Sequence, residues 1–273
     1  MKKLVVNVDE SKDKNLLGKR VVAPLDIVVN SPTTVVDQDG RLLVVIDSFD
    51  DKDLPYVRSF LPHINYQNNL RLANFQGGFE QLRTSDMSFG YRPYKPLFGM
   101  PSGALDFNKK YANWFNRLND MTERVTEIYE TISSDCFNRH KTMAQDIRPE
   151  WLLKGGVFSQ GIINNSVQHS YHYDRGNFKN TMSAMIVLKH KSTGGWLNLP
   201  ALGVTLATED SCIVFFDGQK ILHGVTPIVN RYTSSKRFSI VWYTLAKMVN
   251  SLSADDEINK IRKTDLKKHR KNS

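Results

Sequence analysis

Cysteine is scarce in this chain. Cys136 and Cys212 are the two cysteines among its 273 residues, which excludes a disulfide framework and a cysteine-rich zinc module. We therefore expect an intracellular protein in a reducing compartment. Long apolar runs are missing as well, since none approaches the roughly 20 residues that a membrane span requires. The first residues, Met1–Val6, begin like a leader peptide but meet Asn7 and Asp9 before an apolar core develops, so we expect no membrane segment.

Repeats, low-complexity stretches and Pro/Gly/Ser-rich linkers are also lacking. With 40% hydrophobic and 10% aromatic residues, the chain has enough apolar surface to bury a sizeable core, which excludes an intrinsically disordered protein. We expect a monomer with a single domain over residues 1–248.

Positive charge dominates and is concentrated at the C-terminus. Lys and Arg number 37 against 28 Asp and Glu, a net charge of +9. Residues 260–273 hold seven cations and one acid, Asp265, so this stretch alone carries +6. A basic segment without sustained apolar pattern is typical of a mobile arm that neutralises phosphates, and equally of a solubilising or localisation tail. We place this basic, mobile tail at residues 249–273.

The first half of the chain predicts short strands followed by one long helix. Strands are expected at Arg20–Val22, Leu25–Val29 and Leu42–Ile46. From Phe107 to Ile132 the apolar residues recur at steps of four and three, which places them on one face of a helix, with Asp106 as its N-cap. This stripe is expected to pack against a sheet.

After Pro149 the pattern changes to seven short strands. They are expected at Val157–Ile163, Ala184–Lys189, Trp196–Leu199, Val204–Ala207, Cys212–Phe216, Ile221–His223 and Arg237–Leu245. Turns at Gly194-Gly195 and Asp217-Gly218 favour an antiparallel arrangement. We predict an α+β, β-dominated fold: a double-stranded β-helix (jelly-roll) core at about residues 155–248, buttressed by the N-terminal strands and the long helix.

Two histidines and one aspartate form the candidate metal site. In His172-Tyr173-Asp174 the alternate residues of a strand face the same side, so His172 and Asp174 can reach one ion. Downstream, the strand Cys212–Phe216 and an Asp-Gly turn lead to His223. Two imidazoles and one carboxylate are the facial triad of non-haem Fe(II) oxygenases, which leaves positions open for a bidentate co-substrate and dioxygen.

A candidate anion clamp follows fourteen residues after His223. Arg237 and Ser239 occupy same-face positions of one strand, and a cation with a hydroxyl can hold a carboxylate by charge-assisted hydrogen bonds. A dicarboxylate co-substrate such as 2-oxoglutarate needs such a clamp.

Taken together, these motifs resemble the Fe(II)/2-oxoglutarate dioxygenase superfamily and, within it, the TET/JBP branch of ten-eleven translocation and J-binding-protein oxygenases. The resemblance lies in Gly194–Pro200 (GGWLNLP), Phe215–Gly218 (FFDG), His223–Pro227 (HGVTP) and Arg237–Val241 (RFSIV), with a weaker echo at Phe89–Pro93. It covers roughly residues 160–245. Members of this branch hydroxylate the 5-methyl group of pyrimidines in DNA.

The resemblance implies a role for each matching residue. His172, Asp174 and His223 would ligate Fe(II), while Arg237 and Ser239 would bind 2-oxoglutarate, with dioxygen as the second co-substrate. Asn177 and Tyr243 match an asparagine and an aromatic residue that contact a flipped-out base. Leu245 stands where vertebrate-type enzymes place a second base-reading histidine. Arg92 and the basic tail would contact the DNA.

Three functions remain open at this point. The first is a DNA dioxygenase that oxidises either thymine to 5-hydroxymethyluracil or 5-methylcytosine to 5-hydroxymethylcytosine. The second is a 2-oxoglutarate oxygenase that acts on an RNA base, a protein side chain or a small metabolite. The third is a non-catalytic jelly-roll module that binds nucleic acid, which would have no need of the clamp at Arg237.

Overall fold

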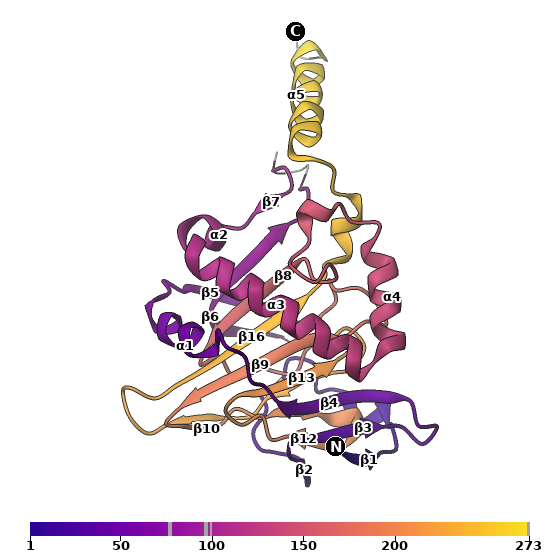
Figure 1. The fold of residues 1–273 in the computed structure, drawn as a ribbon, viewed down its shortest axis with the longest axis vertical. Coiled ribbons are helices and arrows are strands. Elements are labelled where there is room, and N and C mark those ends of the chain that lie inside the picture. Colours follow the sequence, from indigo (N-terminus) through magenta and orange to yellow (C-terminus); the bar gives the residue numbers. More distant parts are fainter. Residues whose placement is uncertain (76–77, 96–97, 99, 272–273) are drawn as a thin grey trace.

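A large mixed sheet runs through the middle of the computed structural model, which describes residues 1–75, 78–95, 98 and 100–271 (Figure 1). Its ten strands include β7 (Gly103–Ala104), which pairs with β6 at one end. The other nine lie in the order β1 (Lys2–Val5), β3 (Thr33–Val36), β4 (Leu42–Ser48), β13 (Cys212–Phe216), β9 (Ser183–His190), β16 (Lys236–Tyr243), β8 (Gln160–Asn165), β6 (Gly78–Arg92) and β5 (Gln67–Phe75). The chain therefore places C-terminal strands between N-terminal ones.

A smaller sheet faces the large one. Its order is β14 (Gly224–Val225), β11 (Leu197–Leu199), β12 (Val204–Leu206) and β2 (Ile27–Val29). Buried residues of both sheets form one apolar cluster, in which Val187 and Val214 of the large sheet meet Leu199 and Val204 of the small one. This two-sheet sandwich is the predicted jelly-roll core, and burial of its facing side chains is the main stabilising contribution. A separate pair, β10 (Ser192–Gly194) with β15 (Ile228–Asn230), extends from its end.

Helices cover the opposite face of the large sheet (Figure 1). They are α1 (Leu54–Phe60), α2 (Asp106–Lys110), α3 (Ala112–Ile132) and α4 (Ser134–Ala144). The predicted apolar stripe is confirmed: Leu118, Met121 and Val125 of α3 are fully buried in the cluster that also contains Ile240 and Trp242 of β16. The short 3-10 helices are η1 (Glu10–Asp13), η2 (Leu61–His63), η4 (Pro149–Trp151), η5 (Pro200–Leu202) and η6 (Ala246–Asn250).

The expected single helix from Phe107 to Ile132 is wrong in one respect. Tyr111, with φ −125° and ψ 48°, leaves the helical region and separates α2 from α3. Its ring stacks on Trp114 at 4.7 Å, and its hydroxyl accepts the N–H of Asn65. Leu105, not Asp106, is the N-cap of α2. The apolar spacing continues across the break, so periodicity could not reveal it.

Two of the expected strands are also wrong. Arg20–Val22 is no strand; Val21 is buried because it packs against Tyr171 and Leu222, and its carbonyl accepts a hydrogen bond from the side chain of Gln168. Ile221–His223 forms no ladder beyond an isolated bridge between His223 and His172. The remaining expected strands are present with ends shifted by a few residues.

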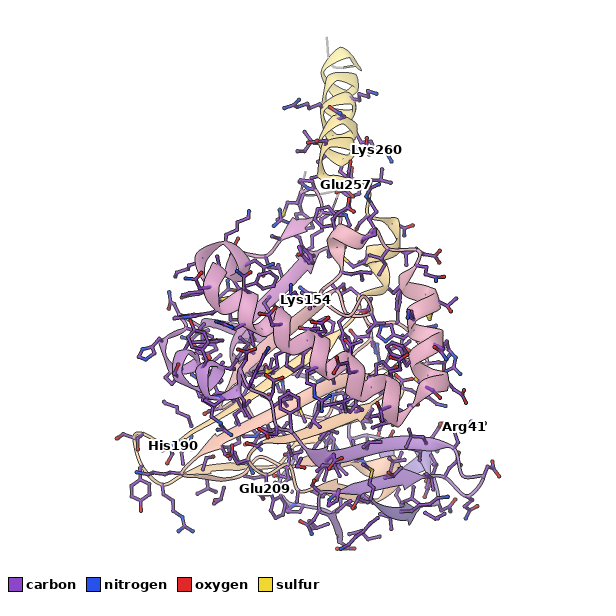
Figure 2. The ribbon with its side chains drawn as sticks, in the orientation of Figure 1. Arg41, Lys154, His190, Glu209, Glu257 and Lys260 are labelled. Carbon is purple, nitrogen blue, oxygen red and sulfur yellow. The ribbon has the colours of Figure 1, made fainter. Side chains whose placement is uncertain are left out.

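The C-terminal segment, expected to be a mobile tail from residue 249, forms helix α5 (Ala254–Lys271), which projects from the body (Figure 1). Its first turn is anchored by Glu257, which is completely buried and accepts hydrogen bonds from the backbone N–H and the hydroxyl of Ser102 and from the N–H of Leu252. Figure 2 shows Glu257 at the base of α5 and Lys260 one turn further. Mobility of the tail stays a prediction, as does the domain boundary at residue 248.

Within the described part of the chain no helix combines the length and the apolar character needed to cross a bilayer.

Candidate active site

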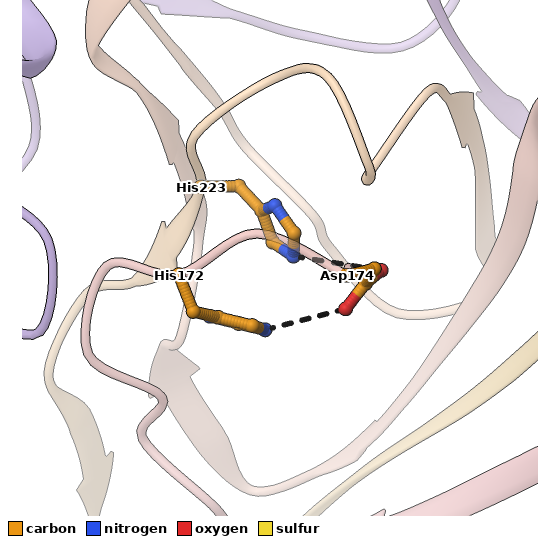
Figure 3. Close-up of side chains that lie close together, drawn as sticks. All are labelled: His172, Asp174 and His223. Atoms are coloured by element: carbon orange, nitrogen blue, oxygen red, sulfur yellow. Dashed lines mark ion pairs between the residues drawn. The ribbon is translucent and has the colours of Figure 1, made fainter. Parts of the chain in front are cut away.

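An antiparallel bridge brings His172 and His223 together. The N–H of His172 donates to the carbonyl of His223 at 2.8 Å, and the reverse bond measures 3.1 Å. The two imidazole centroids are consequently 4.2 Å apart. Asp174 is held beside them because its N–H donates to the carbonyl of Gly218 at 2.8 Å. The residues that the sequence separates by about fifty positions therefore converge (Figure 3).

The side chains of this triad point their ligand atoms at one another. Nε2 of His172 lies 3.7 Å from one carboxylate oxygen of Asp174, and Nε2 of His223 lies 3.9 Å from the other (Figure 3). One ligand atom from each residue lies within 4.8 Å of the others. This is the spacing of a preformed ion site with two nitrogen donors and one oxygen donor.

Hydrogen bonds to backbone carbonyls fix the tautomer of both histidines. Nδ1 of His172 lies 2.9 Å from the carbonyl of Ser170, and Nδ1 of His223 lies 2.9 Å from the carbonyl of Ile221. A carbonyl only accepts, so each Nδ1 carries the proton and each Nε2 offers its lone pair to the shared space. Burial, reinforced by the neighbouring His172, lowers the pKa of His223 to about 4, which keeps this imidazole neutral. The donor set fits a divalent transition metal.

Glycines make room for the triad. A Cβ on Gly218 would lie 2.4 Å from Oδ2 of Asp174, and one on Gly224 would lie 2.6 Å from Cγ2 of Val21. Val21 belongs to the N-terminal segment, whose residues Gly18 and Lys19 exchange backbone hydrogen bonds with Tyr171. The segment thus packs behind His172, a role that its short apolar run did not reveal. The strand expected at His172–Asp174 is wrong, because His172 forms only an isolated bridge with His223.

Arg237 is buried, and the described residues supply it no ion pair. It is 1% exposed, and its Nε and Nη2 have no hydrogen-bond partner among the described residues. Burial lowers its pKa to about 10. A buried cation with unsatisfied donors is costly unless an anion completes it, so the site fits the carboxylate of a dicarboxylic co-substrate. Ser239 lies two residues after Arg237 on the same face of β16 and is also buried. The side-chain amide of Asn164 donates to its hydroxyl at 3.2 Å.

The predicted substrate contacts lie in three places. Asn177 lies three residues after Asp174 and forms an isolated β-bridge with Leu245. Its side-chain amide donates to the hydroxyl of Ser183 at 3.2 Å. Tyr243 ends β16 on the face that carries Arg237 and is half-buried. Arg92 ends β6, where its guanidinium donates to the carbonyls of Pro101 and Ala104, both at 3.3 Å. Arg92 thereby holds β7 in place, and its contact with substrate stays a prediction.

His169 lies beside the triad, although no motif in the sequence points to it. Its ring lies 5.3 Å from that of His172, and its Nε2 is 3.3 Å from Oδ1 of Asn164, the residue that also contacts Ser239. His169 and Asn164 therefore connect the triad with the clamp strand. Only the register of β8 against β16, which pairs Asn164 with Ser239, reveals this link.

Comparisons with known proteins agree with this geometry. The Tet_JBP family model, described as the oxygenase domain of the 2OGFeDO superfamily, matches residues 103–246, which include the triad, Arg237 and Ser239. The bifunctional helicase and thymine dioxygenase JBP2 of Trypanosoma brucei brucei is 27% identical over 131 residues, and that of Trypanosoma cruzi is 28% identical over 139. These matches cover 48% and 50% of this chain but only 12% of either relative.

A solved structure shares the fold. NgTET1 in complex with 5mC DNA superposes with a TM-score of 0.60 at 13% identity, over 92% of this chain and 95% of that one. The β-dominated architecture with its jelly-roll core is therefore shared with NgTET1. Because the family model spans more than half of the chain, the chain belongs to the Tet_JBP family of oxygenases, and it is a dioxygenase that uses Fe(II), 2-oxoglutarate and dioxygen.

Proposed function

We propose that this dioxygenase hydroxylates the 5-methyl group of a pyrimidine base in DNA. The observation that carries the proposal is the His172–Asp174–His223 triad in a chain that also has a buried Arg237 whose Nε and Nη2 lack a partner among the described residues. Support for the substrate comes from the relatives, since JBP2 is named a thymine dioxygenase and NgTET1 was solved with 5mC DNA. The product would be 5-hydroxymethyluracil from thymine or 5-hydroxymethylcytosine from 5-methylcytosine.

In this proposal His172, Asp174 and His223 hold Fe(II), and Arg237 with Ser239 holds the distal carboxylate of 2-oxoglutarate. When bound there, iron with 2-oxoglutarate and dioxygen would supply the oxidising power that hydroxylation of a methyl C–H bond requires. The residues of the chain orient the ligands and the co-substrate and limit the access of water. Its two Nδ1–H donors lock the imidazoles, Arg237 fixes one end of the co-substrate, and burial of His223 at 5% exposure restricts water.

Burial of His223 argues for base flipping. A methyl group stacked inside a duplex cannot approach a ligand set in which His223 is buried and Asp174 is partly buried, so the nucleotide must leave the stack. Asn177, three residues after Asp174, would read the edge of the extruded base with its amide, which the bond to Ser183 orients. Tyr243, beside Leu245 and Asn177 at the end of β16, would stack on its face.

Charge at the C-terminus would hold the DNA. The seven cations of residues 260–273 carry a net +6 on a helix that projects from the domain (Figure 1). Such a helix would neutralise phosphates without reading sequence. Arg92 would add a phosphate contact from the body.

The test is product identification. The full chain is incubated with Fe(II), ascorbate and 2-oxoglutarate on duplex DNA that contains both thymine and 5-methylcytosine, and the nucleosides are analysed by mass spectrometry. The proposal expects one added oxygen on one of the two bases, dependent on 2-oxoglutarate and lost in His172→Ala. Succinate formation without base oxidation would move the substrate to RNA, protein or a metabolite, and DNA binding without succinate would leave a non-catalytic module.

A further inference from the structure

Lys189 lies directly across from Arg237 in the pairing of β9 with β16. Directly opposed residues of an antiparallel pair project to the same face of the sheet, so both cations face the smaller sheet. The side chain of Lys189 is only 4% exposed. A second buried cation therefore accompanies the proposed carboxylate clamp, at the end of the apolar run Ala184–Leu188.

Glu209 neutralises this second cation. Its Oε2 lies 3.0 Å from Nζ of Lys189, and its Oε1 accepts the indole N–H of Trp196 at 2.7 Å. The carboxylate itself stays 59% exposed, in the lower part of the molecule (Figure 2). The indole bond fixes Glu209 in place, so the compensation of Lys189 is built into the fold.

Arg237 receives no such compensation. The turn at Gly194-Gly195 passes so close that a Cβ on Gly195 would lie 2.5 Å from Cδ and Nε of Arg237, and the next residue, Trp196, binds Glu209. The pKa of Lys189 shows that these charges interact. Burial lowers this pKa, the Glu209 carboxylate raises it, and the Arg237 charge lowers it further. Beside the proposed clamp the described residues thus place two buried cations and one partly exposed carboxylate, which leaves a net single positive charge to meet the co-substrate.

We propose that Lys189 is a second cation of the 2-oxoglutarate pocket and that Glu209 sets how strongly it attracts the distal carboxylate. The two residues are positioning residues and act on co-substrate affinity in opposite directions. Loss of the Lys189 charge leaves Glu209 to repel the incoming carboxylate, whereas loss of the Glu209 charge exposes the full attraction of Lys189. This inference rests on the proposed role of Arg237.

The test measures 2-oxoglutarate affinity without turnover. The full chain is loaded with Mn(II), which replaces iron, and titrated with 2-oxoglutarate by calorimetry in the absence of DNA. Lys189→Met is expected to weaken binding at least about fivefold, and Glu209→Gln, which keeps the amide in reach of Trp196 and Lys189, to tighten it about threefold to tenfold. Oxalate, a chelator without a distal carboxylate, is expected to bind all variants alike.

Two control variants separate the possible failures. Lys236→Met removes a cation adjacent to Arg237 in sequence that lies on the opposite face of β16, and it is expected to bind like the parent. Arg237→Met reports on the clamp itself: unchanged 2-oxoglutarate affinity there would refute the clamp. With the clamp intact, unchanged affinity in Lys189→Met, or unchanged or weaker affinity in Glu209→Gln, overturns the proposal. Glu209 is exposed, so its variant remains informative even if Lys189→Met does not fold.

Discussion

Gly218→Ala is expected to damage the metal site while leaving the fold intact. The added Cβ would lie 2.4 Å from Oδ2 of Asp174, against about 3.4 Å for an ordinary contact, and 3.5 Å from Cε1 of His223. The carboxylate must therefore move by about 1 Å. Metal–ligand distances tolerate only about 0.2 Å, so Asp174 leaves its ligand position. The side chain of Asp174 is 28% exposed, which allows it to move toward solvent at little cost in the free energy of unfolding.

We expect metal affinity to fall about 10- to 100-fold, the range seen when the orientation of a ligand is lost, which corresponds to about 1.4–2.7 kcal/mol. Anaerobic titration with Co(II), followed by its visible absorption, measures this loss, and thermal unfolding of the metal-free protein reports on the fold. Gly176→Ala is the matched control, because its Cβ would meet only Cδ2 of Leu245 at 3.4 Å. Parent-like affinity in Gly218→Ala would refute the geometry of the site.

Three further predictions concern the scaffold and the tail. Glu257→Ala leaves the donors of Ser102 and Leu252 unpaired, so we expect hydrogen exchange in the first turns of α5 to accelerate and the free energy of unfolding to fall by about 1–3 kcal/mol; unchanged protection would show that Glu257 does not anchor the helix. Trp242→Phe removes the 2.9 Å bond to Thr122 and part of a fully buried side chain, and urea denaturation should show a loss of about 2–3 kcal/mol, whereas a loss below ~0.5 kcal/mol would contradict the packing. Deletion of residues 260–273 removes a net charge of +6, so the slope of log affinity for duplex DNA against log salt should flatten by up to about 5; an unchanged slope would exclude the tail from DNA contact.

Local patterns were enough to predict much of the site. Arg237 and Ser239 are two residues apart on β16, so strand alternation predicts that their side chains share a face. His172 and Asp174 have the same spacing but form no strand, and the bridge to His223 and the bond from Asp174 to Gly218 bring them together instead. The apolar stripe of α3 likewise follows from helical spacing alone. The structure places His172, Asp174 and His223 together, as predicted.

Contacts between distant segments could not be predicted in this way. Glu257 lies 155 residues from Ser102, and Lys189 meets Arg237 only through the register of β9 against β16. Val21 has the apolar character of a strand residue, yet it is buried because Gly224 leaves space for it beside the metal site. Such contacts depend on where the chain returns, which neither hydrophobic period nor residue type specifies.

The fate of the methyl group tests the central claim most directly. Duplex oligonucleotides carry a fully deuterated 5-methyl group on thymine or on 5-methylcytosine. They are incubated with the Fe(II)-loaded full chain, 2-oxoglutarate and ¹⁸O-labelled dioxygen, and the masses of the nucleosides are measured by mass spectrometry. The account predicts that one of the two bases loses one deuterium and gains one labelled oxygen for each succinate formed. Full retention of deuterium on both bases while succinate accumulates would contradict it.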